Sequence, residues 1–574
     1  MKRTLGIIVS VAALILPACD NTGSTTTTST TTTSTTATST TAPWVPQEGL
    51  DFKEPDQVWS KDHILEITLE AKSPETIEVS GQKLIARPFK ATTGTHANPS
   101  GKDFGFKLNG PTLHVNGGDT IRVTFVNHLG KDQVTNIHYH GLNVDPKDYG
   151  DNIFREFKDG DTNLSQVTLP INHPLGTYWY HVHPHGSSEE QVMGGLSGLL
   201  IIEGTVQLLP SQLQNIPQHQ FAFRDVQTCS NTNNEAQICG ENEINPNKPS
   251  IRLVNGLYKP KLEMTEGQPE FWRLANIGSD VFYRIALVRI GRTAAVPLTV
   301  LAQDGLLVWM PPLVEFLPKD EELLLPPGLR FDALVPGLEP GIYELRSLPY
   351  AQHAVLKTEG KEPVIEPQPV PAQDTTLATI TVKPKPAGIA VAPAAPLTTG
   401  LIPSEDLSNA PIAERHTLVF SYGTDPSTKK FQGWINGKAF THGMMPAVSP
   451  VLNTVEEWVL ENATTDDHPF HIHVNDFQVM SVNGEPYNTN HHQDVVIIPK
   501  QYTKNGQVVN GQVVIRIKFE GFYGWFVYHC HILKHEDEGM MATIQVRQNA
   551  TDPITPPPSP PPPPTPPPLP SGAM

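Results

Sequence analysis

Four pairs of histidines, each with one residue between its members, are the residues of this chain best suited to chemistry. They are His138/His140 in IHYHGL, His181/His183 in YHVHPHG, His471/His473 in HPFHIHVN and His529/His531 on either side of Cys530. On an extended strand, residues two apart point to the same face, so each pair offers two imidazoles side by side. Eight imidazoles that converge on one interface are enough for a cluster of several metal ions.

Cys530 is expected to point away from the two histidines that flank it. His468 stands three residues before His471 and is expected on the side of Cys530, while His535 and Met540 follow in the sequence. One cysteine, two histidines and a distant methionine form the donor set of a blue-copper electron-transfer site. Zinc is the main competing metal, but this number of paired histidines exceeds a tetrahedral zinc site, and the soft donors favour copper.

The segments that carry these residues alternate between apolar and polar side chains. TIRVTFVN (120–127) sets Ile, Val and Phe against Thr and Arg, and VIRIKFEG (514–521) alternates in the same way. Such alternation is typical of half-buried strands, and Gly, Pro and Asn turns separate many similar segments. The folded body is therefore predicted to be all-β.

Three segments resemble one another and divide the body into domains. They are VNGGDTIRVTFVN ending at Asn127, MTEGQPEFWRLAN ending at Asn276 and SPVLNTVEEWVLEN ending at Asn462. A turn residue stands nine positions before each closing asparagine, which indicates one β-sandwich unit used three times. We place the domains at 46–205, 206–383 and 412–548, with a Pro/Ala-rich crossover linker at 384–411.

Both ends of the chain differ in composition from the body. Residues 1–18 have a basic start and an apolar run that predict an export signal, and LPAC predicts lipidation of Cys19; ordinary signal cleavage beside a chance cysteine is the alternative. Residues 19–45 form a Thr/Ser-rich tether, and residues 549–574 form a Pro-rich tail expected to be disordered.

Charge and cysteine usage narrow the class of partners. The formal net charge is −18 without a Lys/Arg cluster, so nucleic acid is not an expected partner, and contact with a membrane is expected only through a lipid anchor. Cys229 and Cys239 lie in the turn-rich segment TCSNTNNEAQIC, where a disulfide in an exported protein is favoured over two free thiols.

With these residues assembled, the sequence resembles the multicopper oxidases, and among them the three-domain bacterial laccases. The resemblance spans 46–548 and contains the four copper signatures in family order. It implies three cupredoxin domains, Greek-key β-sandwiches, and four copper ions. It assigns the type 1 copper to His468, Cys530, His535 and Met540, the type 2 copper to His138 and His471, and the two type 3 coppers to His140, His181, His183, His473, His529 and His531.

The resemblance also implies a reaction. One-electron oxidation of a phenol or aromatic amine at the type 1 copper would drive four-electron reduction of dioxygen to water at the trinuclear cluster. Oxygen reduction consumes protons, and Glu536 and Asp151 are the candidate donors, with Asp148 as the alternative to Asp151. The enzyme is expected to be a monomeric lipoprotein of the bacterial cell envelope, periplasmic or on the cell surface.

Two other functions stay open at this point. A metallo-oxidase for Cu(I), Mn(II) or Fe(II) would suit the acidic charge and the run Glu536-Asp537-Glu538, although such a run is more typical of a solvated surface. The ten methionines form no Met-rich insert, which weakens the Cu(I) version. A non-enzymatic envelope scaffold would be expected to lack copper ligands, whereas here the ligand set is intact.

Overall fold

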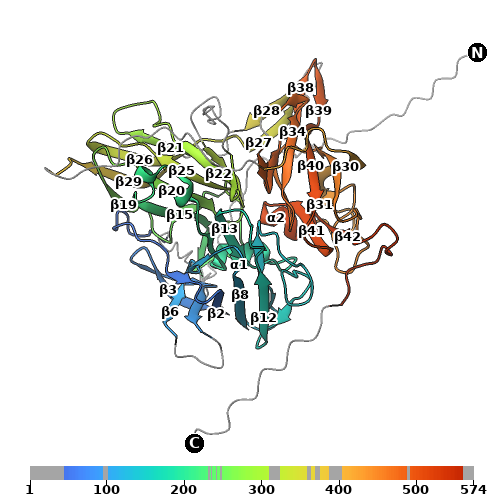
Figure 1. The fold of residues 1–574 in the computed structure, drawn as a ribbon, viewed down its shortest axis with the longest axis horizontal. Helices are drawn as coiled ribbons and strands as arrows, with labels where there is room; N and C mark the ends of the chain where they lie inside the picture. Colours follow the sequence, from blue (N-terminus) through green and yellow to red (C-terminus); the bar gives the residue numbers. More distant parts are fainter. Residues whose placement is uncertain are drawn as a thin grey trace, which may run out of the picture. The chain divides into compact units, whose positions relative to one another are not determined.

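The computed structural model describes residues 44–94, 101–230, 233, 235–240, 242–245, 248–308, 323–357, 364–368, 375–386, 404–487 and 491–559. Its elements are almost all strands, in agreement with the predicted fold class (Figure 1). The signal segment, Cys19, most of the tether and most of the crossover linker lie outside these residues. Within the described part, no helix is both long and apolar enough to cross a membrane.

Domain 1 contains two five-stranded sheets. In the first, the strand order is β1 (Gln57–Trp59), β7 (Thr112–Val115), β14 (Ser197–Ile202), β13 (Gly176–His181) and β10 (His138–His140). In the second, it is β12 (Thr162–Thr168), β8 (Thr120–His128), β2 (Ile64–Lys72), β5 (Phe89–Thr93) and β6 (Asp103–Lys107). The helix α1 (Ser188–Gly194) connects β13 to β14.

Domain 2 also has two large sheets. One has the order β18 (Ile251–Val254), β15 (Gln218–Val226), β20 (Glu270–Asn276), β25 (Arg330–Val335), β22 (Thr299–Gln303) and β23 (Leu306–Leu307). The other has the order β19 (Lys261–Thr265), β29 (Thr375–Lys383), β26 (Gly341–Leu348), β21 (Tyr283–Arg289) and β24 (Leu323–Leu325).

Domain 3 repeats the arrangement. Its larger sheet has the order β31 (Phe431–Ile435), β30 (Ile412–Thr424), β32 (Thr454–Asn462), β40 (Gly511–Phe519), β34 (Phe477–Val482) and β35 (Glu485–Pro486), with β36 (His492–Gln493) beside β34. Its smaller sheet has the order β37 (Val495–Ile498), β33 (His468–Ile472), β41 (Gly524–Cys530) and β42 (Met541–Val546), and α2 (Leu533–Asp537) connects β41 to β42. Three short strand pairs lie outside these six sheets: β9 (Val134–Thr135) with β11 (Phe157–Lys158), β27 (His353–Lys357) with β28 (Val364–Gln368), and β38 (Tyr502–Lys504) with β39 (Gln507–Val509). The elements η1 (Val206–Leu208) and η2 (Ser211–Leu213) are short 3-10 helices.

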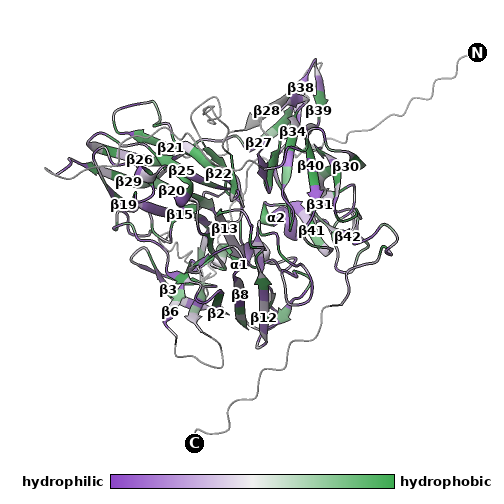
Figure 2. Cartoon of the chain, in the orientation of Figure 1, coloured by the Kyte–Doolittle hydropathy of each residue, from purple (hydrophilic) through white to green (hydrophobic). Residues whose placement is uncertain are grey.

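The alternating segments bury one face, as their pattern predicts. In β8 the side chains of Ile121, Val123 and Phe125 are fully buried while the residues between them are partly exposed, and β40 alternates in the same way. Each domain has one large apolar cluster between its sheets. Hydrophobic stretches accordingly lie on the strands of all three domains (Figure 2).

The three repeated segments form β8, β20 and β32, and they occupy equivalent places. Each lies between a parallel neighbour (β2, β15 or β30) and an antiparallel one (β12, β25 or β40). The turn residues Gly118, Gly267 and Asn453 all have a positive φ, of 87°, 70° and 65°. This conformation favours Gly and Asn, which explains why these two residue types recur there.

The closing asparagine of each repeat has the same structural task. Asn127, Asn276 and Asn462 are fully buried. Each side-chain amide donates to a backbone carbonyl at a distance of 3.0 to 3.1 Å and accepts from the backbone N–H two residues further on. Because the amide pairs with an N–H of the strand-to-loop turn and with a carbonyl of a segment distant in the chain, an apolar residue there would leave these backbone groups unpaired.

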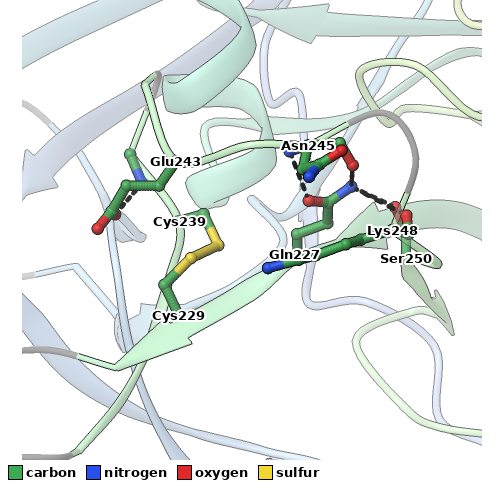
Figure 3. Close-up of a disulfide and its surroundings, with 8 residues drawn as sticks. Gln227, Cys229, Cys239, Glu243, Asn245, Lys248 and Ser250 are labelled. Carbon is green, nitrogen blue, oxygen red and sulfur yellow. Dashed lines mark hydrogen bonds between the residues drawn. A yellow bond between two sulfur atoms is a disulfide. The ribbon is translucent and has the colours of Figure 1, made fainter. Parts of the chain in front are cut away.

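One sheet crosses the expected boundary between domains 1 and 2. Strands β3 (Glu75–Val79) and β4 (Gln82–Ala86) pair with β17 (Ala236–Ile238) and β16 (Thr228–Ser230). The segment that contains β16 and β17 also holds a disulfide between Cys229 and Cys239, with an S–S distance of 2.09 Å (Figure 3). Beside it, Gln227 exchanges two hydrogen bonds of 2.9 Å with the backbone of Asn245 (Figure 3).

The first part of the expected tail contacts domain 3. The indole of Trp525 donates to the carbonyl of Thr555 at 2.9 Å, and the side chain of Gln545 bonds to the backbone of Pro553 and Thr555. Residues 549–559 therefore differ from the disordered tail that composition predicts, because their backbone groups find partners on β41 and β42.

Candidate metal centre

The four histidine pairs lie at the ends of neighbouring strands. On the domain 1 side, His138 is opposite His181 in the register of β10 and β13. On the domain 3 side, His471 is opposite His529 in the register of β33 and β41. All eight imidazoles are at most 1% exposed. The strands thus bring the first and third domains together around a core made of histidine.

Within this core the eight rings form overlapping groups of three. His140, His181 and His531 form one group of three, and His183, His473 and His529 form another. In the first group His531 Nε2 lies 3.1 Å from His140 Nδ1, and in the second His183 Nε2 lies 3.2 Å from His529 Nε2. His138 and His471 form a third group with His140, which the first group shares. His138 stacks on His473 and His471 on His140, both at 3.7 Å between ring centroids.

The nitrogens that point away from the core have hydrogen-bond partners. His138 Nδ1 lies 2.9 Å from Asp151, His181 Nδ1 lies 2.9 Å from the carbonyl of Val182, and His471 Nδ1 lies 2.8 Å from the carbonyl of Asp494. The opposite nitrogens, Nε2 of the same three histidines, are buried without a partner. Buried orphaned lone pairs that converge are what a metal ion would satisfy.

Burial also keeps these imidazoles in the form that binds metal. It lowers the pKa of His181 to about 3 and that of His529 to about 4, because a charged ring would lose its hydration. The other six pKa values are lowered as well, first by burial and then by the neighbouring histidines. Neutral imidazoles keep a lone pair available for coordination.

A second donor set lies on the other side of β41. Cys530 Sγ is 3.4 Å from His468 Nδ1 and 3.7 Å from His535 Nδ1, and the two imidazole nitrogens are 3.2 Å apart. Cys530 and Met540 are fully buried in one apolar cluster, and the Cys530 N–H donates to the Met540 carbonyl at 3.1 Å. The cysteine thus faces a different site from His529 and His531, which belong to the two groups of three.

Both acids expected near the centre touch cluster histidines. Asp151 is 2% exposed and also accepts the Tyr139 N–H at 3.0 Å, whereas Asp148, the alternative, is exposed. Glu536 is fully buried, and its two oxygens lie 3.2 Å from His183 Nδ1 and 3.2 Å from His529 Nδ1.

The acidic run of α2 is not a solvated patch. The Asp537 carboxylate accepts the backbone N–H groups of Gly186, Ser188 and Glu189 at 2.8 to 3.0 Å, where α1 begins. Glu538 pairs with Lys534 at 2.9 Å. The run connects domains 1 and 3 next to the centre.

A buried ion triad near the histidines escaped the sequence prediction. Arg330, at the start of β25 in domain 2, donates to both oxygens of Asp494 in domain 3 at 2.7 and 2.8 Å, and Asp304 lies 3.4 Å from the same guanidinium. Asp494 Oδ1 lies 3.1 Å from His140 Nε2. The sequence around Asp494 does not indicate this role, because the partners of Asp494 are distant in the chain.

Domain 2 also reaches the centre through Gly328. This residue has φ of +89°, and a Cβ placed on it would lie 2.9 Å from His531 Cδ2 and 3.0 Å from His140 Cε1. The middle domain supplies none of the twelve expected ligands, yet its backbone forms one wall of the histidine core.

Ten buried histidines and one buried cysteine, all contributed by domains 1 and 3, form donor sets of the kind that bind copper. Two models of the family described as multicopper oxidase match residues 101–207 and 413–550. This chain belongs to the multicopper oxidases, which are copper-dependent oxidoreductases that use dioxygen.

Individual relatives agree with this membership. Multicopper oxidase mco of Staphylococcus haemolyticus is 26% identical over 470 residues, which cover 80% of this chain and 87% of that protein. Laccase-1 of Cryptococcus neoformans is 24% identical over 517 residues, covering 77% and 76%. The solved structure of the Campylobacter jejuni multicopper oxidase, described as a metallo-oxidase, matches this chain with a TM-score of 0.62 and 24% sequence identity. The match covers 87% of this chain and 96% of that chain, and it shows that the two share the cupredoxin fold.

Proposed function

We propose that the centre holds four copper ions and couples one-electron oxidation of a reducing substrate to reduction of dioxygen to water. The type 1 ion would be held by His468, Cys530, His535 and Met540. The other three would lie among the eight paired histidines: the type 2 ion at His138 and His471, and the type 3 pair at the two groups of three. The two groups of three that share no residue support the type 3 assignment, and the group of His138, His140 and His471 contains both proposed type 2 ligands.

The observation that carries the proposal is the double role of one strand end. Cys530 belongs to one donor set, while its neighbours His529 and His531 each belong to a different group of three. Bound copper would supply one-electron chemistry at both sites, and the Cys530 backbone would give a short covalent route between them. Asp151 and Glu536 would orient the histidines that they touch and exchange protons with the oxygen site.

The reducing substrate is proposed to be a phenol or an aromatic amine. Direct docking on an imidazole is limited, however, because His468 is fully buried and its Nε2 lies 2.8 Å from the Thr464 hydroxyl. The rings of Tyr422 and Phe431 lie 5.7 and 5.5 Å from that of His535. A phenol would therefore pass its electron across a thin layer of side chains.

An acidic residue beside these aromatic rings favours a metallo-oxidase as the second candidate. Asp466, two residues before His468, lies 2.8 Å from both Tyr422 Oη and His353 Nδ1, and its side chain is 15% exposed. A carboxylate at this position is suited to Fe(II) or Mn(II), whereas the soft ion Cu(I) prefers sulfur ligands.

Oxygen uptake by copper-loaded protein would separate the candidates. A phenol, Cu(I), Fe(II) and Mn(II) should be compared side by side in the wild type and in Asp466→Asn. A cation substrate predicts a raised KM for that cation alone, whereas Glu263→Gln, which removes an exposed acid of domain 2, should change nothing. Absence of uptake with all four would refute the oxidase proposal and support a scaffold.

The location of the enzyme is also a proposal. Lipidation of Cys19 would display the oxidase on the Thr/Ser-rich tether at the cell envelope, where the protein would work as a monomer. Metabolic labelling with a fatty acid should mark the wild type and not Cys19→Ser. Equal labelling of both proteins would contradict it.

A further inference from the structure

Three side chains outside the copper set meet at the junction of domains 1 and 3. His185 and Glu156 come from domain 1, and His442 comes from the loop between β31 and β32 of domain 3. Glu156 Oε1 lies 3.5 Å from His442 Nε2 and accepts the backbone N–H of His185 at 3.2 Å. The two imidazole centroids are 5.8 Å apart.

The imidazole of His185 has an unsatisfied atom. Its Nδ1 is buried and has no hydrogen-bond partner, while its ring packs edge-on against Phe440 with the centroids 4.8 Å apart. A buried imidazole nitrogen without a partner costs free energy that a ligand would recover.

The spacing of the two rings matches that of the copper site. In the group of His140, His181 and His531 the centroids are 4.9, 5.5 and 5.9 Å apart. The His185–His442 distance of 5.8 Å falls within that range. An ordinary His–Glu ion pair would explain His442 and Glu156 but would leave His185 Nδ1 unexplained.

We propose that His185, His442 and Glu156 bind one late first-row divalent cation, such as Zn²⁺ or Cu²⁺, at the surface between domains 1 and 3. Two imidazoles and a carboxylate suit these metals, with water in the remaining position. The side chains of His442 and Glu156 are 48% and 21% exposed, so an ion reaches the site without opening the fold. The site uses none of the twelve proposed copper ligands and does not depend on the proposed function.

Zinc titration of the copper-loaded protein by calorimetry would test the site, because Zn²⁺ is redox-inert. The wild type is expected to bind one Zn²⁺ beyond its copper. His185→Gln and His442→Gln should each weaken this binding about tenfold or more, since even loss of an outer-shell partner costs about 10–100-fold in metal affinity. Copper content and blue absorption should stay unchanged in both variants and show that they are folded.

His128→Gln is the matched control. His128 lies 3.0 Å from Glu70 and is 49% exposed, so it resembles the His442–Glu156 pair without a third ligand. Its replacement should leave zinc affinity unchanged. The proposal would be overturned if the wild type bound no additional zinc, if His185→Gln and His442→Gln both bound it as tightly as the wild type, or if His128→Gln weakened it equally.

Discussion

Arg330→Met is the perturbation that most directly tests the role of domain 2. The guanidinium is fully buried between Asp494 and Asp304 and also donates to the carbonyls of Thr177 and Gly328 at 3.1 and 3.0 Å. Its removal would leave two buried carboxylates without a cation. Breaking a buried pair in this way costs about 3–5 kcal/mol of unfolding free energy. For a domain of this size the loss corresponds to a lower Tm, on the order of 10 °C.

The same substitution should disturb the oxygen site specifically. The Asp494 carboxylate lies 3.1 Å from His140 Nε2, and the backbone carbonyl of the same residue accepts from His471 Nδ1 at 2.8 Å. Displacement of the carboxylate would release His140 and disturb the residue whose carbonyl holds His471. Loss of such outer-shell support costs about 10–100-fold in metal affinity or activity. After anaerobic reduction and mixing with oxygen in a stopped-flow instrument, the blue absorption should return about 10–100-fold more slowly. The blue absorption of the fully oxidised variant should keep its wild-type intensity.

Arg273→Met separates this effect from general destabilisation. Arg273 lies 3.0 Å from Asp332 and 3.1 Å from Thr177 Oγ1, its side chain is 3% exposed, and both partners of the ion pair lie on β20 and β25. It should lose a similar Tm and reoxidise at the wild-type rate. Equal slowing in both variants, or normal reoxidation in Arg330→Met, would refute the positioning role.

Three further outcomes are expected. Gly328→Ala should lower the copper content of the cluster, measured by metal analysis and EPR, because its Cβ would lie 2.9 Å from His531 Cδ2; Gly256→Ala, with φ of +77° and no atom within 4 Å, should not. Asp151→Asn should slow reoxidation about tenfold or more and keep the blue absorption, because Asn cannot exchange a proton beside His138. The same change at exposed Asp148 should have no effect. Normal turnover of Asp151→Asn would contradict the role of Asp151 in proton transfer. His492→Gln should destabilise the protein more at about pH 5.5 than at about pH 8.5 in calorimetry. Burial opposes the charge of His492, but the ion pair with Asp476 at 2.7 Å raises the pKa of His492 above its ordinary value of about 6.5. The ion pair therefore stabilises the folded state fully below about pH 6.5, and this stabilisation is lost as the pH rises through the raised pKa. A pH-independent difference for His492→Gln would contradict that account.

Local patterns were sufficient for much of the fold. The alternation in 120–127 and 514–521 and the recurring Gly or Asn before each repeat are dictated by one strand and its turn, so sequence carries them directly. The convergence of the histidine pairs could likewise be predicted, because strand periodicity decides which side chains share a face.

Features that depend on distant partners could not be predicted. The position of the Asp494 carboxylate is fixed by its ion pair with Arg330, which is 164 residues away in the chain. No local sequence pattern indicates either residue. The pairing of β4 with β17 and the burial of Glu536 depend in the same way on how the domains pack. The acidic composition of residues 536–538 is typical of a solvated surface. Composition contains no information about the residues of domain 1 that cover this run in the folded protein.

The arrangement of the histidine core also sets an order of events during biosynthesis. His140 and His531 lie 3.1 Å apart in space and 391 positions apart in the chain. Domains fold as units from the N-terminus as the ribosome proceeds, so domain 1 is complete long before its metal-binding partners emerge. A chain released early would keep four histidines exposed and would be unable to close the cluster. Completion of the cluster therefore requires a chain that includes the last domain.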